Sequence, residues 1–170
     1  MNDDREEGRA TSEPTVGVHV HFGMTGTVPL RLADLFFTTE HLLVAEYGTI
    51  TPVVGLLTGA PGREAAGLAR TYRDRGLEGV RESVDRTTVV PYEEIERIVC
   101  HDGRWVAREK VAVHVADGPP YGYRIHAPVD LEAFADGLAS FPPTATLPVE
   151  VRSGVGFDPV ESLRRFRRGR

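Results

Sequence analysis

Hydrophobic and polar positions alternate strictly over residues 16–22. A period of two is typical of a strand that buries one face, because successive side chains of a strand point to opposite sides. The pattern therefore predicts a polar face that carries His19 and His21, and a buried face behind it. The residues expected on the buried face are Val16, Val18, Val20 and Phe22.

Two apolar runs come next, at residues 35–38 and 42–47, and a short polar segment over residues 38–41 separates them. Apolar runs that flank a short polar turn are typical of a β-hairpin. Before them, Gly23 and Gly26 interrupt the first strand. We expect pairing to resume over residues 28–32, so the chain should open with a series of neighbouring strands.

Residues 52–86 depart from the β pattern and are predicted to form a helical insertion. Residues 53–60 are apolar and rich in glycine, and Pro61 and Gly62 then lead into a segment with apolar residues at helical spacing. The residues at that spacing are Ala65, Leu68, Ala69 and Tyr72. Gly76 is expected to end or kink this helix. A second short helix is predicted from the spacing of Leu77, Val80 and Val84.

The strand pattern returns from Thr87 onward. Residues 111–115 and 121–126 alternate, and the Asp-Gly-Pro-Pro sequence between them predicts a turn. Residues 91–99 fit two interpretations: a helix with Pro91 at its first position, or a strand. We favour the strand, because β-branched residues lead into the segment and Ile-Val-Cys continues it.

A closing helix is predicted over residues 130–141. Asp130 is a residue type that caps helix N-termini, and Pro142 and Pro143 prevent the helix from continuing. Its apolar stripe consists of Leu131, Phe134, Ala135 and Leu138. We expect the stripe to close the end of a single core. The residues predicted to meet there are Val18, Val20, Phe36, Leu43, Val113, Tyr123, Ile125, Phe134 and Leu138.

The hairpin turn and the later Val-Pro-Tyr-Glu-Glu-Ile step resemble those of bacterial and archaeal PH-like (pleckstrin-homology-like, GRAM-like) domains. The residues that carry the resemblance are Thr38, Leu42, Pro91, Tyr92 and Ile95, while His41 stands where arginine is common. The resemblance covers residues 16–141 with the insertion set aside. It implies a mainly β (α+β) fold: a bent seven-stranded β-sandwich or barrel with a C-terminal capping helix. Such folds bind lipids, peptides or proteins, so the fold does not decide the function.

Composition and charge set the organisation of the chain. With 170 residues and 41% hydrophobic residues, the sequence is long and apolar enough for one domain with a core. We predict a disordered acidic leader over 1–14, the domain over 15–141, and a C-terminal extension over 142–170 with a short basic helix. The net charge of −5 argues against nucleic-acid binding. Cys100 is the single cysteine, which favours a reducing cytoplasm.

The histidines are the candidate metal ligands. His19 and His21 are two residues apart on one face of a strand, and His114 and His126 also fall on polar strand faces. A three- or four-histidine zinc or copper site would need these strands to be neighbours. No acidic residue stands at a diagnostic spacing, so we expect no metal and no cofactor. Cys100 is expected to be a buried hydrophobe rather than a nucleophile, so no catalytic residue is assigned.

These observations favour a non-enzymatic binding or scaffold domain that engages a protein partner or itself. The alternative is a membrane-peripheral module that binds anionic lipid through the apolar insertion and the arginine-rich tail. A metal-binding protein or an enzyme is the third interpretation. The candidate partner or membrane contacts are Val53, Val54, Leu56, Leu57, Arg164, Arg165, Arg167 and Arg168.

Overall fold

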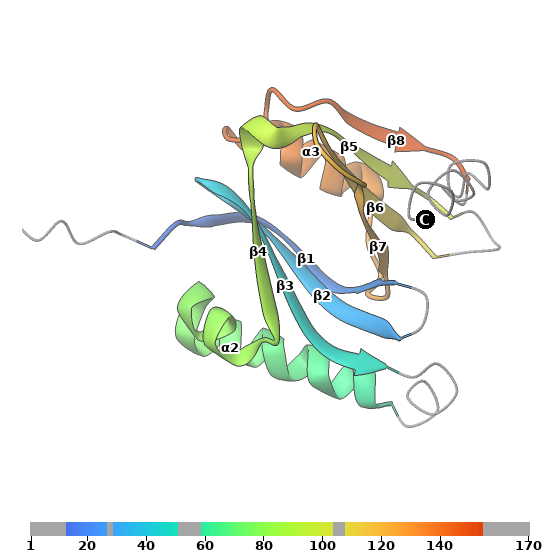
Figure 1. Ribbon diagram of the computed structural model, residues 1–170. Coiled ribbons are helices and arrows are strands. Elements are labelled where there is room, and N and C mark those ends of the chain that lie inside the picture. The colour runs from blue at the N-terminus through green and yellow to red at the C-terminus, as the bar shows by residue number, and fades with distance from the viewer. Residues whose placement is uncertain (1–12, 27–28, 51–58, 104–107, 155–170) are drawn as a thin grey trace, which may run out of the picture.

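The computed structural model describes residues 13–26, 29–50, 59–103 and 108–154. Within these ranges the protein is mainly β, as the sequence predicts, and Figure 1 shows one bent sheet with two helices packed on it. In chain order the elements are β1 (Val16–Thr25), β2 (Leu30–Thr38), β3 (His41–Ile50), α2 (Ala60–Ser83), β4 (Arg86–Pro91), a 3₁₀ turn η1 (Tyr92–Glu94), β5 (Ile95–His101), β6 (Lys110–Val115), β7 (Tyr121–Ile125), α3 (Leu131–Ser140) and β8 (Val149–Arg152). No helix in the described ranges combines the length and the apolar character needed to cross a membrane.

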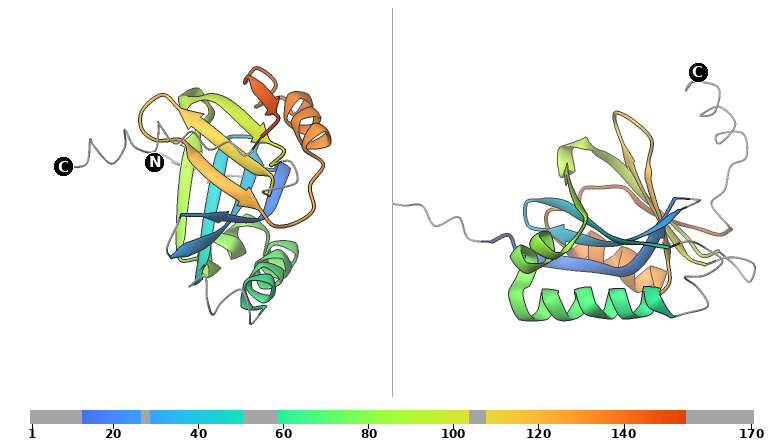
Figure 2. Two further views of the ribbon diagram at one scale, coloured as in Figure 1. Left: turned by 90° about the vertical axis from the view of Figure 1, so that its right-hand side faces the viewer. Right: turned by 60° about the horizontal axis from the view of Figure 1, so that its bottom comes forward.

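The strand order is β4-β3-β2-β1-β7-β6-β5-β8. Two antiparallel series, β1 to β4 and β5 to β7, are joined where Gly23 and Met24 of β1 pair with β7. The two views in Figure 2 show the sheet bending so that the second series lies over the first. β8 adds an eighth strand, parallel to β5, that the seven-stranded expectation did not include.

Several local predictions are confirmed. The hairpin places Phe37 opposite Leu42, α2 departs from helical geometry at Gly76 (φ 63°), and the Asp130 side chain caps α3. The prediction of a strand over residues 91–99 is partly confirmed. The chain is extended on both sides, but the turn η1 separates β4 from β5, because the chain must pass from one series of strands to the other.

Two hydrophobic cores are present, whereas the sequence pattern predicted one. The first lies between the two series of strands and is closed by Leu131, Phe134 and Leu138 of α3. The second lies between the outer face of the first series and α2. The prediction for Phe36 and Leu43 was wrong, because both side chains belong to the second core. Helix α2 covers a face that would otherwise meet solvent, so β2 and β3 are buried on both sides.

The predicted single apolar face of β1 was also wrong. Val18 and Val20 contact the first core, whereas Val16 and Phe22 pack on the second. The register of β1 against β2 shifts twice, between Val16 and Val18 and between Val20 and Gly23. Each shift adds a residue to β1, and an added residue exchanges the two faces of a strand. Strict alternation in the sequence therefore does not give strict alternation in space.

Candidate functional site

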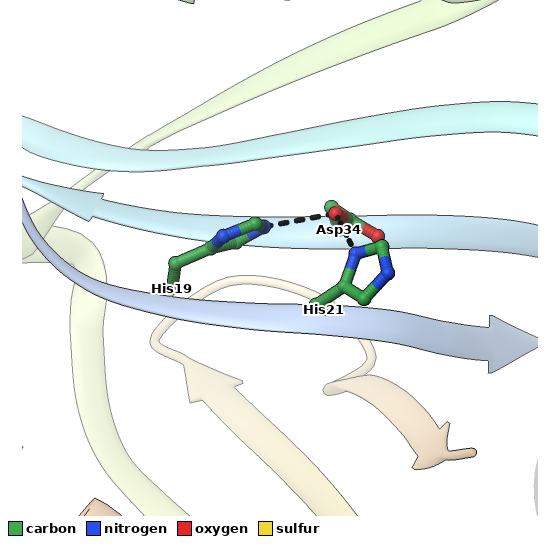
Figure 3. A group of neighbouring side chains, drawn as sticks. All are labelled: His19, His21 and Asp34. Carbon is green, nitrogen blue, oxygen red and sulfur yellow. Dashed lines mark hydrogen bonds and ion pairs between the residues drawn. The ribbon is translucent and has the colours of Figure 1, made fainter. Parts of the chain in front are cut away.

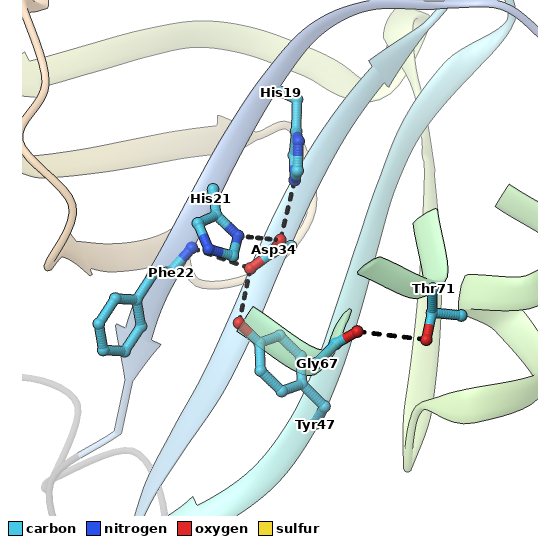
Figure 4. Close-up of polar contacts among 7 residues, drawn as sticks. All are labelled: His19, His21, Phe22, Asp34, Tyr47, Gly67 and Thr71. Carbon is cyan, nitrogen blue, oxygen red and sulfur yellow. Dashed lines mark hydrogen bonds and ion pairs between the residues drawn. The ribbon is translucent and has the colours of Figure 1, made fainter. Parts of the chain in front are cut away.

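The candidate site is built around Asp34 of β2, whose side chain is fully buried. Its Oδ2 atom lies 2.8 Å from His19 Nε2 and 2.8 Å from His21 Nδ1 (Figure 3). Its Oδ1 atom accepts hydrogen bonds from the backbone N–H of Phe22 at 2.9 Å and from the Tyr47 hydroxyl at 2.7 Å (Figure 4). An ionised carboxylate only accepts hydrogen bonds, so both imidazole nitrogens are donors in this arrangement.

A β-bulge creates this arrangement. Val20 pairs with Leu35 and Gly23 pairs with Ala33, so two residues of β1, His21 and Phe22, face one residue of β2. Phe22 has a φ of 58°, and it is the one non-glycine residue with positive φ in the described ranges. Such a conformation costs on the order of 1–3 kcal/mol and persists only where the surroundings hold it. The hydrogen bond from its N–H to Asp34 is one such restraint.

The charge of Asp34 is maintained despite burial. Burial by itself would raise the pKa of this carboxyl, but the hydrogen bonds from His19 and His21 and their charges outweigh burial and lower the pKa to about 2. The hydrogen bond to Asp34 raises the pKa of His21, against the effect of burial. Burial and the neighbouring carboxylate of Asp34 raise the pKa of Tyr47, which therefore stays a hydrogen-bond donor.

The two histidines connect this buried carboxylate with the surface. The ring of His19 stacks on Phe36, with 4.2 Å between ring centroids, and meets the edge of Tyr72 from α2 at 5.4 Å. These contacts fix the orientation of the imidazole. The side chains of His19 and His21 are nevertheless 22% and 32% exposed, so small solutes reach them from solvent.

His19, His21 and Asp34 form a group whose ligand atoms all lie within 4.8 Å of one another. The alternation of residues 16–22 predicted the two histidines on one strand face, whereas no sequence pattern predicted the carboxylate. The signal that was available is that Asp34 is the one charged residue within an otherwise apolar run from Leu32 to Phe37. A charge in such a run is buried by its neighbours, and a buried charge needs partners.

Other candidate residues lie elsewhere. His126 packs against Phe22 with 5.3 Å between ring centroids, and His114 Nδ1 is 3.4 Å from Arg97 Nη2, so neither belongs to the Asp34 group. Cys100 is fully buried in the first core, and burial raises the pKa of its thiol to about 11, which suits a hydrophobe and not a nucleophile.

The predicted contact residues fall outside the described residues. These are Val53, Val54, Leu56 and Leu57 of the insertion and Arg164, Arg165, Arg167 and Arg168 of the tail.

Comparison with known proteins identifies a similar fold but no family. No protein-family model matches the chain, and no curated protein matches it. Among solved structures, the chain is similar to the hSac2 domain from human phosphoinositide phosphatase Sac2, with a TM-score of 0.50 and 9% sequence identity. The match covers 87% of this chain and 81% of that chain. At this identity the likeness concerns the fold alone.

Proposed function

We propose that this protein is a non-enzymatic interaction domain with a PH-like fold, which binds an extended protein segment at the outer edge of β4, an outermost strand of the sheet among the described residues. Contacts between the residues of the resemblance support the fold assignment. The Thr38 hydroxyl accepts hydrogen bonds from the backbone N–H groups of Glu40 and His41, which shapes the hairpin turn. The Tyr92 hydroxyl donates to the Thr38 carbonyl at 2.6 Å, so the two segments that suggested the family contact each other.

The observation that carries the binding proposal is the position of the exposed large hydrophobic residues. Within the described ranges these are Val89, 52% exposed, and Val151, 46% exposed. Val89 is in β4 and Val151 is in β8, which are the two outermost strands of the sheet. An outermost strand has backbone N–H and C=O groups without strand partners, and an extended peptide can add to it as a further strand.

Of the two edges, β4 suits a partner better. It is six residues long, and its central Thr87, Thr88 and Val89 are β-branched, which favours an added strand. By contrast, β8 has four residues, and Arg152 and Glu150 form an exposed ion pair along it. Charged side chains on an edge strand discourage pairing. The partner is therefore an extended protein segment along β4, and a second copy of this chain is the first candidate for it.

Sedimentation velocity of the full chain over a concentration series tests the proposal. We expect concentration-dependent association that Val89→Lys abolishes, because a lysine there places a charge against the added strand. Val151→Lys is the matched control and should associate like the parent. In parallel, peptides selected by display against the parent should lose binding to Val89→Lys alone. If the parent neither self-associates nor selects peptides that depend on Val89, the β4 proposal is wrong.

A further inference from the structure

We infer that His19, His21 and Asp34 form a binding site for a divalent transition-metal ion, with zinc as the ion that suits it best. The inference is independent of the proposed role of β4. It reverses the expectation of no metal. That expectation rested on a sequence pattern that contains a pair of histidines and no acidic partner at a diagnostic spacing. The structure supplies the third ligand, because the bulge in β1 places His21 directly against Asp34 of the neighbouring strand.

The donor set matches the chemistry of zinc. Two imidazole nitrogens and one carboxylate oxygen are ligands found in zinc sites, and three protein ligands leave the fourth position to water or to a donor atom of a ligand. The histidines approach from two directions with different nitrogens, Nε2 of His19 and Nδ1 of His21 (Figure 3). Both nitrogens point at one oxygen, so the three donor atoms already converge.

The two oxygens of Asp34 have different surroundings. Oδ1 is held by the Phe22 N–H and the Tyr47 hydroxyl, whereas the hydrogen-bond partners of Oδ2 are the two imidazoles. Ligating carboxylates are commonly oriented by hydrogen bonds of this kind from outside the metal shell. Oδ1 therefore anchors the side chain, and Oδ2 is the ligand atom. Stacking on Phe36 restrains the ring of His19 in the same way.

A small rearrangement converts the hydrogen-bonded group into a metal site. Zinc bonds of about 2.0–2.1 Å in tetrahedral geometry set adjacent ligand atoms roughly 3.3 Å apart. The present distances of 2.8 Å from Oδ2 to each nitrogen must therefore widen by about half an ångström. The two nitrogens, which lie within 4.8 Å of each other, must reach the same separation of roughly 3.3 Å. Each ligating nitrogen must also present a lone pair, so its proton moves to the other ring nitrogen or to solvent. The partial exposure of both side chains allows this exchange and the entry of the ion.

The test is a calorimetric titration of Zn²⁺ alone into the full chain after treatment with a chelator. We expect one zinc ion per chain. In the double variant His19→Gln/His21→Asn, each amide keeps an N–H donor near the position of the original one, so the bonds to Asp34 are retained while the imidazole ligands are lost. Its zinc affinity should fall by at least about a hundredfold, because changing even the outer partners of a site costs about 10–100-fold. His126→Gln, which changes a histidine outside the group, should bind like the parent.

A second measurement on the parent removes the dependence on variant folding. Zinc should shift the imidazole nitrogen resonances of two histidines, those of His19 and His21, and leave the other four unchanged. Absence of zinc binding by the parent overturns the inference. So does equal affinity in the parent and the double variant, or a set of shifted resonances that excludes His19 and His21. The Asp34 network would then act only in holding the bulge of β1.

Discussion

The two cores of this protein are built on opposite faces of the same strands and differ in chemistry. The first, between the two series of strands, is apolar and ends in the ring of Phe134 and the side chain of Leu138 from α3. The second, under α2, adjoins the charged group of Asp34, His19 and His21. Both faces of the sheet therefore bury apolar side chains, and the second also holds a polar group in a defined geometry.

The largest effect is expected in the first core. Phe134→Ala removes a buried ring that lies 6.2 Å, between ring centroids, from Phe37. It should lower the free energy of unfolding by about 3–5 kcal/mol, because burial is lost and a cavity remains. Chemical denaturation measures this change. A variant that unfolds at the denaturant concentration of the parent would show that α3 does not close the core.

Asp34→Asn tests the second region without a large change in volume. The amide brings a donor into a group that already contains four donors and removes the charge that accepts from them. We expect a loss of about 2–3 kcal/mol in the free energy of unfolding, since the partly buried imidazole donors lose a charged acceptor. Asp117→Asn, on the exposed turn between β6 and β7, is the matched control and should be neutral.

Acid should weaken the Asp34 region in a defined pH window. The pKa of Asp34 is about 2 in the folded protein, against 3.8 for the ordinary side chain. A lowered pKa means that the unfolded state binds the proton more readily, so this contribution is complete above about pH 5 and disappears as the pH falls toward 2. This contribution to the free energy of unfolding amounts to about 2 kcal/mol. We therefore expect the difference in unfolding free energy between the chelator-treated parent and Asp34→Asn to shrink as the pH falls. A difference that is constant from neutral pH to pH 2 would contradict the assignment.

The smallest effect is expected for Tyr47→Phe. This change removes one hydrogen bond to Asp34 Oδ1 and leaves the Phe22 N–H as the other donor to that oxygen. A loss of about 1 kcal/mol is expected, the usual net value of a single hydrogen bond. Tyr121→Phe on β7 serves as the control. If Tyr47→Phe costs as much as Asp34→Asn, the hydroxyl and not the carboxylate organises the group.

Local features of the sequence predicted the elements well. The polar turn of the hairpin, the glycine kink in α2 and the Asp130 cap of α3 depend on residues close together in the chain. Their conformational preferences act within a few residues, so the pattern alone identified them. The mainly β character followed from the same patterns.

The tertiary structure decided which face each strand residue occupies. Two bulges in β1 exchange its faces, and α2 folds back over β2 and β3 to make Phe36 and Leu43 part of a second core. Both depend on pairing between distant segments, because the position of an added residue is defined only against the neighbouring strand. The same applies to the candidate site. The sequence by itself places two histidines on one strand and a single aspartate in an apolar run. Only the register of β1 on β2 brings these residues within hydrogen-bonding distance.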